Sequence, residues 1–426
     1  MQRRFARSNH SGDCQCNLRC SRYPLTRITV YTGTGFVGAS RQKKCQVAEF
    51  DRRCRSHCAD PSTRAWWIAV VQRQRALAPS DGPRTDRCSK HGRGRRLSLP
   101  QFKLLRPRTV QEAVALLTNC RKNEGARATR VIAGGTDLIP SMQQKLFEPE
   151  YVLDIRHIAE LKGIRQTQTG TEIGALTTLA EIEHSGFLRQ HYSVLAEAGA
   201  TVASPLLRNM GTIGGNICLD TRCLWYNQSL TWRKGCGFCI KKDGDLCHVA
   251  PGGTKCWAAF SGDTPAALLC LDAEVEIAGA AGFRRMPLQE FYTGEGDSYR
   301  NLRPDEILTR VFLPASSADY RGVYRKLRIR GSIDYPLAGV AVALKRSNGY
   351  VADARVALTA VNPAPLLVKN AGELLAGKVV DATLAEAIGN LAAKTAKPLT
   401  TSALTPEYRR EMIRVFTKRA VLAAFN

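Results

Sequence analysis

Six cysteines gather within 39 residues, directly after a glycine-rich segment. They are Cys218, Cys223, Cys236, Cys239, Cys247 and Cys256. Thiolates bind zinc and iron, and four of them supply one ligand for each iron of a cubane cluster. The preceding segment consists of Thr212, Ile213, Gly214, Gly215 and Asn216. Because tandem glycines let backbone amides converge on an anion without Cβ obstruction, the stretch predicts a phosphate-binding turn beside a metal site.

A second tandem-glycine loop lies earlier in the chain, after a short β-branched segment that predicts a buried strand over residues 129–133. The segment and loop contain Val131, Ile132, Ala133, Gly134, Gly135, Thr136, Asp137 and Leu138. Neither loop fits the G-x-G-x-x-G pattern of Rossmann domains, and a single Gly-Gly turn is weak support for any ligand. Together the two loops predict a cradle for the pyrophosphate of a flavin dinucleotide.

Strand and helix patterns alternate along the chain from residue 99. Thr109 with Glu112, and Thr178 with Glu181, have the spacing of capping boxes at helix starts. Strands are predicted at residues 151–155, 172–175, 274–277 and 356–361. This alternation predicts an α/β or α+β core. Cys120 and Cys270 lie in apolar surroundings and are expected to be core residues, and Cys218 a small buried side chain.

Composition excludes several classes of protein. The chain has 426 residues, of which 44% are hydrophobic. No apolar run is long enough to span a bilayer, and no apolar segment follows the basic N-terminus, so we expect no signal peptide and a cytoplasmic location. Fifteen cysteines in such a chain favour metal ligation or free thiols over disulfides.

The charge is concentrated in the first part of the chain. Residues 1–98 hold 21 Lys and Arg against 6 Asp and Glu, whereas the other 328 residues hold 41 against 31. The first segment has no sustained periodicity and seven irregularly spaced cysteines that fit no zinc finger. We expect it to precede the true start of the protein, with a disordered basic tail as the alternative. A nucleic-acid-binding protein is the remote alternative for the whole chain.

The two glycine loops resemble the FAD-pyrophosphate loops of the flavin subunits of molybdenum hydroxylases, the family that includes xanthine and carbon monoxide dehydrogenases. The resemblance extends from Leu99 to the C-terminus and includes Asp263, Leu308, Lys326 and the Asp334-Tyr335-Pro336 segment. It implies an FAD-binding domain of the PCMH type, with two α/β subdomains, and then a C-terminal domain with a small antiparallel sheet and helices. The FAD-binding residues implied are 131–138, 212–216, Asp263, Leu308 and Lys326.

The cysteine-rich segment is an insertion relative to most of that family. Asn216 and Asp263 are 47 positions apart, and the extra loop resembles that of the 4-hydroxybenzoyl-CoA reductases, which binds a [4Fe–4S] cluster. Spacing alone would nominate Cys236 from the Cys236-x-x-Cys239 pair. The resemblance instead implies Cys223, Cys239, Cys247 and Cys256 as the ligands, and a structural four-cysteine zinc site is the alternative.

The resemblance implies a function in electron transfer, with no catalytic acid, base or nucleophile in this chain. A large subunit would hold the molybdenum cofactor, a small subunit two [2Fe–2S] clusters, and a ferredoxin would donate electrons for reductive dehydroxylation of an aromatic acyl-CoA. The alternative is a hydroxylase flavin subunit that passes electrons outward. The expected domains are residues 99–316, divided near 157 and with the insertion at 218–258, and residues 317–426.

Overall fold

The computed structural model describes residues 99–124 and 129–426. The expectations for residues 1–98, including their cysteines, their basic character and the position of the true start, lie outside the described residues.

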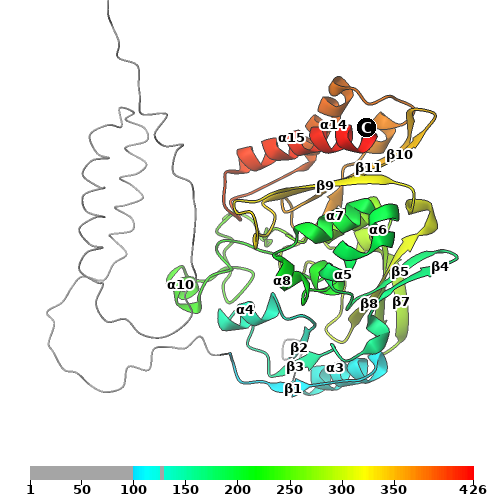
Figure 1. The fold of residues 1–426 in the computed structure, drawn as a ribbon. Coiled ribbons are helices and arrows are strands. Elements are labelled where there is room, and N and C mark those ends of the chain that lie inside the picture. Colours follow the sequence, from blue (N-terminus) through cyan, green and yellow to red (C-terminus); the bar gives the residue numbers. More distant parts are fainter. Residues whose placement is uncertain (1–98, 125–128) are drawn as a thin grey trace, which may run out of the picture. The chain divides into compact units, whose positions relative to one another are not determined.

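A small parallel sheet forms the first part of the described chain (Figure 1). Its strands are β1 (Lys103–Leu105), β3 (Tyr151–Asp154) and β2 (Thr129–Ile132), in that order. The helices are α3 (Val110–Glu124) and α4 (Leu138–Gln143), followed by the short helix η1 (Ala159–Leu161). The predicted buried strand at residues 129–133 is instead a half-exposed edge strand, with Val131 37% exposed. It is open because one of its sides lines the cleft described below.

Both predicted capping residues accept a hydrogen bond at a helix start. Thr109 Oγ1 accepts from the amide of Glu112 at 3.1 Å, while the Glu112 carboxylate reaches back to the amide of Arg108. Thr178 and Glu181 form a complete capping box at the start of α5 (Leu179–His184). These caps satisfy amides that the first helical turn leaves without partners.

A five-stranded antiparallel sheet forms the second part, in the order β4-β5-β8-β6-β7. The strands are β4 (Ile164–Thr167), β5 (Gly170–Gly174), β6 (Glu274–Gly279), β7 (Gly282–Pro287) and β8 (Ile307–Pro314). Its helices are α6 (Gly186–His191), α7 (Ser193–Thr201), α8 (Pro205–Arg208), α9 (Ile213–Ile217), α11 (Thr264–Cys270), α12 (Leu288–Phe291) and η2 (Ala315–Ser317). Tight hairpins join β4 to β5 and β6 to β7, so the strands of this mixed helix-and-sheet region run antiparallel.

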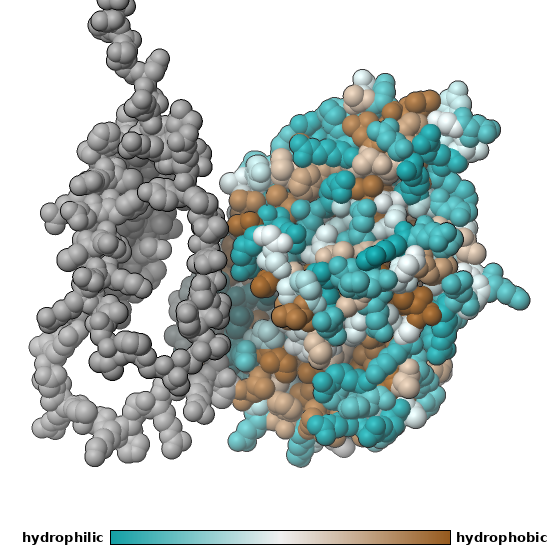
Figure 2. Space-filling model, viewed as in Figure 1, coloured by the Kyte–Doolittle hydropathy of each residue, from teal (hydrophilic) through white to brown (hydrophobic). Residues whose placement is uncertain are grey.

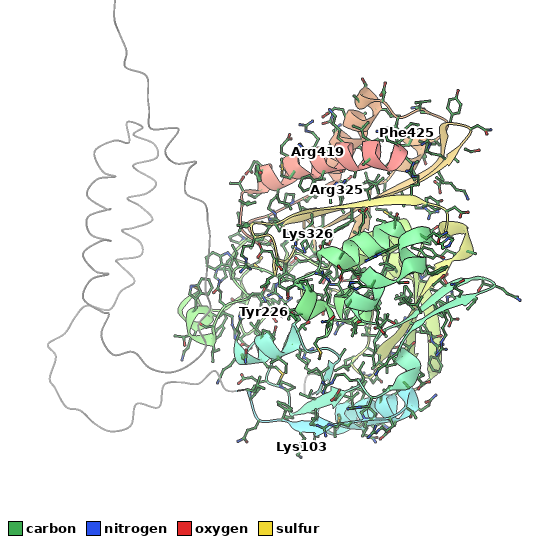
Figure 3. The ribbon with its side chains drawn as sticks, in the orientation of Figure 1. Lys103, Tyr226, Arg325, Lys326, Arg419 and Phe425 are labelled. Atoms are coloured by element: carbon green, nitrogen blue, oxygen red, sulfur yellow. The ribbon has the colours of Figure 1, made fainter. Side chains whose placement is uncertain are left out.

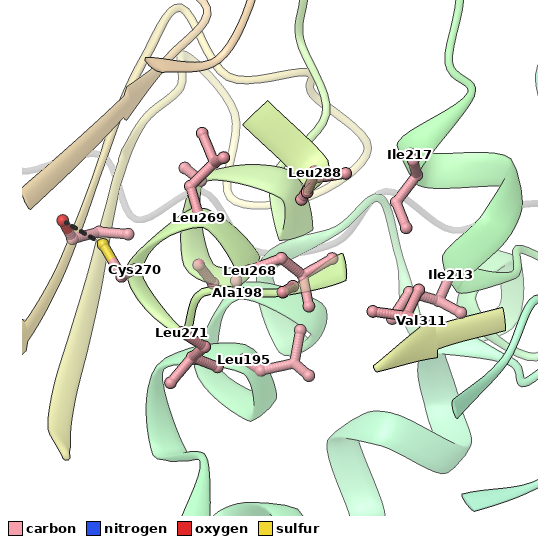
Figure 4. Packing of buried hydrophobic residues seen from close by; sticks show 14 of the residues in the cluster. Leu195, Ala198, Ile213, Ile217, Leu268, Leu269, Cys270, Leu271, Leu288 and Val311 are labelled. Atoms are coloured by element: carbon pink, nitrogen blue, oxygen red, sulfur yellow. Dashed lines mark hydrogen bonds between the residues drawn. The ribbon is translucent and has the colours of Figure 1, made fainter. Parts of the chain in front are cut away.

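Helix α11 is the centre of the largest hydrophobic core (Figure 4). All seven of its residues are buried, because the helix lies between α7 and α9 on one side and the C-terminal sheet on the other. Cys270 is fully buried and its thiol lies 3.5 Å from the carbonyl oxygen of Ala341 on that sheet. The predicted core positions of Cys270 and Cys120 are confirmed, whereas Cys218 is only half-buried.

A four-stranded antiparallel sheet and three helices form the C-terminal part (Figure 1). The strands are β9 (Arg321–Leu327), β10 (Ala338–Ser347), β11 (Tyr350–Thr359) and β12 (Leu366–Leu367), in the order β12-β11-β10-β9. The helices are α13 (Ala371–Leu375), α14 (Ala382–Thr395) and α15 (Pro406–Phe425). Helix α15 packs on β9 and β10 and is itself covered by α14. Arg409 of α15 is fully buried and donates hydrogen bonds to three backbone carbonyls.

The cysteine-rich insertion is mostly irregular and contains one short helix, α10 (Leu230–Gly235). Figure 2 shows hydrophobic residues in separate patches among hydrophilic ones on one face of the described chain. Among the helices of residues 99–124 and 129–426, none combines the length and apolar character needed to cross a membrane.

Candidate cofactor sites

A cleft of about 1590 Å³ runs past both glycine loops. Its lining includes the first loop with β2, the second loop, part of the insertion, and the segment around Tyr335. All the predicted FAD-binding residues line it except Ile213 and Lys326. Ile213 is instead a fully buried core residue, because its side chain faces the core beneath the loop.

The first glycine loop presents free backbone donors to this cleft. The amides of Gly134, Gly135 and Thr136 have no acceptor within the described residues. Gly135 has a φ of +73°, a conformation that glycine adopts without strain. A Cβ on Gly134 would lie 1.8 Å from the carbonyl oxygen of Met210, so glycine is required for the two loop regions to touch. Free amides in a glycine turn can donate hydrogen bonds to the oxygens of a pyrophosphate.

The second glycine loop uses its amides within the protein. Ile213 donates to the carbonyl of Thr177, Gly214 donates to that of Ala175, and the Thr212 hydroxyl caps Gly215. The second loop therefore lines the cleft while its amides at Ile213, Gly214 and Gly215 are engaged within the protein. Here glycine allows close packing, since a Cβ on Gly214 would lie 2.8 Å from that of Ala175.

Asn216 also has a structural partner. Its side-chain oxygen accepts hydrogen bonds from both the amide and the hydroxyl of Thr264, at 3.0 and 2.7 Å. Asn216 thus anchors the start of α11 to the second loop and still lines the cleft. Leu308, on β8, lines it as well.

Asp263 and Lys326 form a buried ion pair behind the cleft. Lys326 Nζ lies 3.0 Å from Asp263 Oδ2 and also donates to the carbonyl of Thr201. The Tyr324 hydroxyl donates to the other Asp263 oxygen at 2.8 Å. Burial raises the pKa of Asp263, and the ammonium of Lys326 and the hydroxyl of Tyr324 act against that rise. In this structure the ammonium of Lys326 therefore binds Asp263 and does not line the cleft. Figure 3 marks the position of Lys326 on β9.

A contact that joins three parts of the chain escaped the sequence analysis. Asp137 Oδ1, in the first glycine loop, accepts hydrogen bonds from Arg222 at 2.9 Å and from Tyr335 at 2.8 Å. The Arg222 guanidinium also lies 4.0 Å from the centre of the Tyr335 ring. We call these three residues the Asp137 clasp. No pattern in the sequence links them, because Asp137 and Tyr335 are 198 positions apart.

The four predicted cluster ligands line one small cavity in the insertion. Cys223, Cys239, Cys247 and Cys256 are all buried and surround it together with apolar and aromatic side chains, among them Trp225, Ile240 and Val249. Cys236 is half-buried and absent from this lining, as is Cys218. The structure thus groups the same four cysteines that the resemblance implied.

Two of the four thiols are harder to ionise than a thiol in water. Burial raises the pKa of Cys223 to about 11 and that of Cys256 to about 12. Thiolates bind metals, so a bound cation would have to supply the charge that deprotonates them.

No group of three or more His, Cys, Asp or Glu side chains within the described residues is arranged to hold a metal ion. Tetrahedral zinc with Zn–S bonds of about 2.3 Å needs its four sulfurs in close mutual contact. A cubane carries each thiolate on a different iron and so spreads the four thiolates farther apart. Within the described residues the four thiols share one cavity lining and are not arranged to hold a single metal ion.

Comparisons with known proteins agree with an FAD-binding role for the residues that line the cleft. Residues 100–316 match the family model "FAD binding domain in molybdopterin dehydrogenase", and residues 322–424 match "CO dehydrogenase flavoprotein C-terminal domain".

Two curated relatives and one solved structure are similar over most of their lengths. The carbon monoxide dehydrogenase medium chain of Afipia carboxidovorans is 32% identical, over 75% of this chain and 95% of the relative. The nicotinate dehydrogenase FAD-subunit of Eubacterium barkeri is 31% identical, over 66% and 81%. A crystal structure of Cu,Mo-CO dehydrogenase matches with a TM-score of 0.64 and 31% identity, over 77% of this chain and 99% of that one. The fold is therefore a PCMH-type FAD-binding domain followed by the family's C-terminal domain, and the chain belongs to the FAD-binding subunits of the molybdenum hydroxylase family.

Proposed function

We propose that this chain binds FAD and a [4Fe–4S] cluster and passes electrons between them in a molybdenum-containing complex. The relative named a medium chain and the matched Cu,Mo-CO dehydrogenase structure support a multi-subunit assembly. The partners proposed are a large subunit with the molybdenum cofactor and a small subunit with [2Fe–2S] clusters. The bound cofactors supply the redox chemistry, and the protein binds, orients and tunes them.

One observation carries the cluster half of this proposal: four buried thiols from a 34-residue stretch surround one cavity. Four thiols around one space match the ligand set of a cubane cluster, which takes one thiolate for each iron. Cys236, which spacing alone would have chosen, does not line the cavity.

The FAD half rests on the first glycine loop. Its free amides at Gly134, Gly135 and Thr136 suit the pyrophosphate, and the cleft that continues from them has room for the rest of a dinucleotide. We place the remaining cofactor contacts on the cleft-lining members of the predicted set.

The reaction we assign is the reductive dehydroxylation of an aromatic acyl-CoA, as in the 4-hydroxybenzoyl-CoA reductases. The motive is the cysteine insertion, which in those enzymes holds the extra cluster. A low-potential donor such as ferredoxin would deliver electrons, which would leave through FAD toward the molybdenum site.

A second candidate has its own support. The relatives of this chain include carbon monoxide and nicotinate dehydrogenases, which favours a hydroxylase flavin subunit that passes electrons from the molybdenum site outward. In that case the insertion would be a structural loop.

The two candidates are separated by metal analysis of the complex purified anaerobically. The first predicts FAD together with iron and acid-labile sulfide in excess of what the [2Fe–2S] clusters of the small subunit contain; zinc, or no excess of iron and sulfide, would exclude it. Cys239→Ser should remove the iron and sulfide of this chain and keep FAD, while the matched variant Cys236→Ser should keep both.

Activity assays then decide the reaction. Reduction of 4-hydroxybenzoyl-CoA with a reduced ferredoxin supports the first candidate. Oxidation of carbon monoxide, nicotinate or xanthine with a dye acceptor, and no reductase activity, supports the second.

A further inference from the structure

Three residues of the insertion form a wall that belongs to both cofactor sites. Tyr226, Ile240 and Lys241 line the cysteine cavity and also line the large cleft. Figure 3 marks Tyr226 in this part of the chain. Of the three, Lys241 alone carries a charge.

The ammonium of Lys241 is buried and fixed in position. It donates to Asp220 Oδ1 at 2.8 Å and to the carbonyls of Thr221 and Gly296, each at 2.9 Å. The Lys241 side chain is 5% exposed. It cannot reach solvent without breaking these contacts, because each of its partners belongs to the packed interior of the insertion or to the segment beside it.

The surroundings of Lys241 strengthen the effect of its charge. The rings of Tyr226 and Tyr299 lie 4.5 and 5.6 Å from Nζ. Asp220 is the ion-pair partner, and its second oxygen has no hydrogen-bond partner in the part of the chain that is described. Charges in such a poorly hydrated place interact more strongly than charges in water.

A short path of contacts leads from Lys241 to one of the four cysteines. Gly296, whose carbonyl accepts from Lys241, donates its amide to the carbonyl of Cys256 at 2.9 Å. A Cβ on Gly296 would lie 2.7 Å from Cys256 Sγ. The backbone that holds Lys241 is therefore in contact with the sulfur that faces the cavity.

We propose that Lys241 is a tuning residue that raises the reduction potential of the iron–sulfur cluster, with Asp220 acting in the opposite direction. This inference rests on the proposed function. Reduction of the cluster adds one electron and breaks no bond, so the reduced state carries one more negative charge. A fixed cation in the shared wall stabilises that state, and net charge near a cluster is one of the protein's levers on its potential.

The test is a redox titration of the intact complex with dithionite and mediators, followed by the electron paramagnetic resonance signal of the reduced cluster. Lys241→Met should lower the midpoint potential, so that at the wild-type midpoint the ratio of reduced to oxidised cluster falls by about tenfold or more. Lys241→Arg, which keeps the charge, should stay near wild type. Asp220→Asn should raise the midpoint.

The opposite signs separate a charge effect from a structural one. Lys241→Met and Asp220→Asn both remove the ion pair between the two side chains, so a purely structural role would move both potentials the same way. Unchanged potentials, or shifts of the same sign with iron retained, would overturn the inference. If Lys241→Met loses the cluster, the midpoint potential of Asp220→Asn alone tests the inference, and a potential that is unchanged or lower would overturn it. Absence of iron and sulfide from the wild-type chain would instead overturn the proposed function.

Discussion

Lys326 Nζ lies 3.0 Å from Asp263 Oδ2, and each of the two side chains is only 3% exposed. The pair joins β9 of the C-terminal part to the start of α11, where the second glycine loop is anchored. Removing one partner of a buried pair leaves the other charge without compensation.

Lys326→Met should therefore destabilise the protein by about 3–5 kcal/mol. The double variant Lys326→Met/Asp263→Asn should recover much of that loss, because the remaining groups are then neutral. Urea unfolding of the two variants and wild type measures both effects. Equal losses in the single and double variants would show that packing, and not charge, is responsible.

The loss of unfolding free energy in Lys326→Met should also depend on pH. Burial raises the pKa of Asp263, and loss of the cation raises it further. A carboxyl group whose folded pKa exceeds its unfolded value contributes stability that is complete below the unfolded pKa and is lost as the pH rises through the folded pKa. The deficit should thus be small near pH about 4 and grow toward neutrality. Unfolding curves recorded across this range check the trend, and a flat deficit would contradict it.

Gly134→Ala should prevent FAD binding. The added Cβ would lie 1.8 Å from the carbonyl oxygen of Met210, so the first loop must move away from the second region. We expect FAD content to fall at least about tenfold, which corresponds to a loss of about 1.4 kcal/mol in binding. Gly186→Ala is the matched control, since its Cβ meets no atom within 4 Å. FAD content is measured by absorbance after denaturation.

Gly296→Ala should affect the cysteine cavity and leave FAD binding intact. Its Cβ would lie 2.7 Å from Cys256 Sγ and 2.6 Å from the amide of Ala258, so the fourth cysteine is displaced. Iron and sulfide should be lost while FAD is retained. Gly252→Ala, in open space within the same insertion, should keep both. Loss of FAD together with iron in Gly296→Ala would mean that the damage extends beyond the cysteine cavity.

The Asp137 clasp should slow the release of FAD. Tyr335→Phe removes one neutral donor and Arg222→Met removes the ion pair, each at a cost of about 1 kcal/mol or less. Faster FAD dissociation, by several-fold in each variant, is the expected result of a stopped-flow dilution experiment. An unchanged rate in both would show that the clasp has no part in holding the cofactor.

The sequence was informative where a local pattern determines the structure. The capping box of Thr178 and Glu181 is complete, and the strands expected near residues 151, 172, 274 and 356 are present. These features depend on neighbours a few positions away, so their physical cause is readable in one segment. The mixed helix-and-strand class followed from such segments, whereas the FAD-binding fold followed from the resemblance of the two glycine loops to a known family.

The remainder depends on contacts between distant segments. The amides of Ile213 and Gly214 donate to the backbone carbonyls of Thr177 and Ala175, and no spacing in the sequence could reveal these bonds. Lys326 looked like a flavin ligand but its ammonium faces Asp263. Likewise the place of Lys241 in two cavity walls depends on how the insertion folds back on the cleft.

Asp137 Oδ1 binds the insertion through Arg222 and the C-terminal segment through Tyr335 at the same atom. A single carboxylate oxygen thus fastens both segments to the first glycine loop, and all three residues line the cleft. A change at Asp137 therefore removes both contacts at once, whereas a change at Arg222 or Tyr335 removes only one.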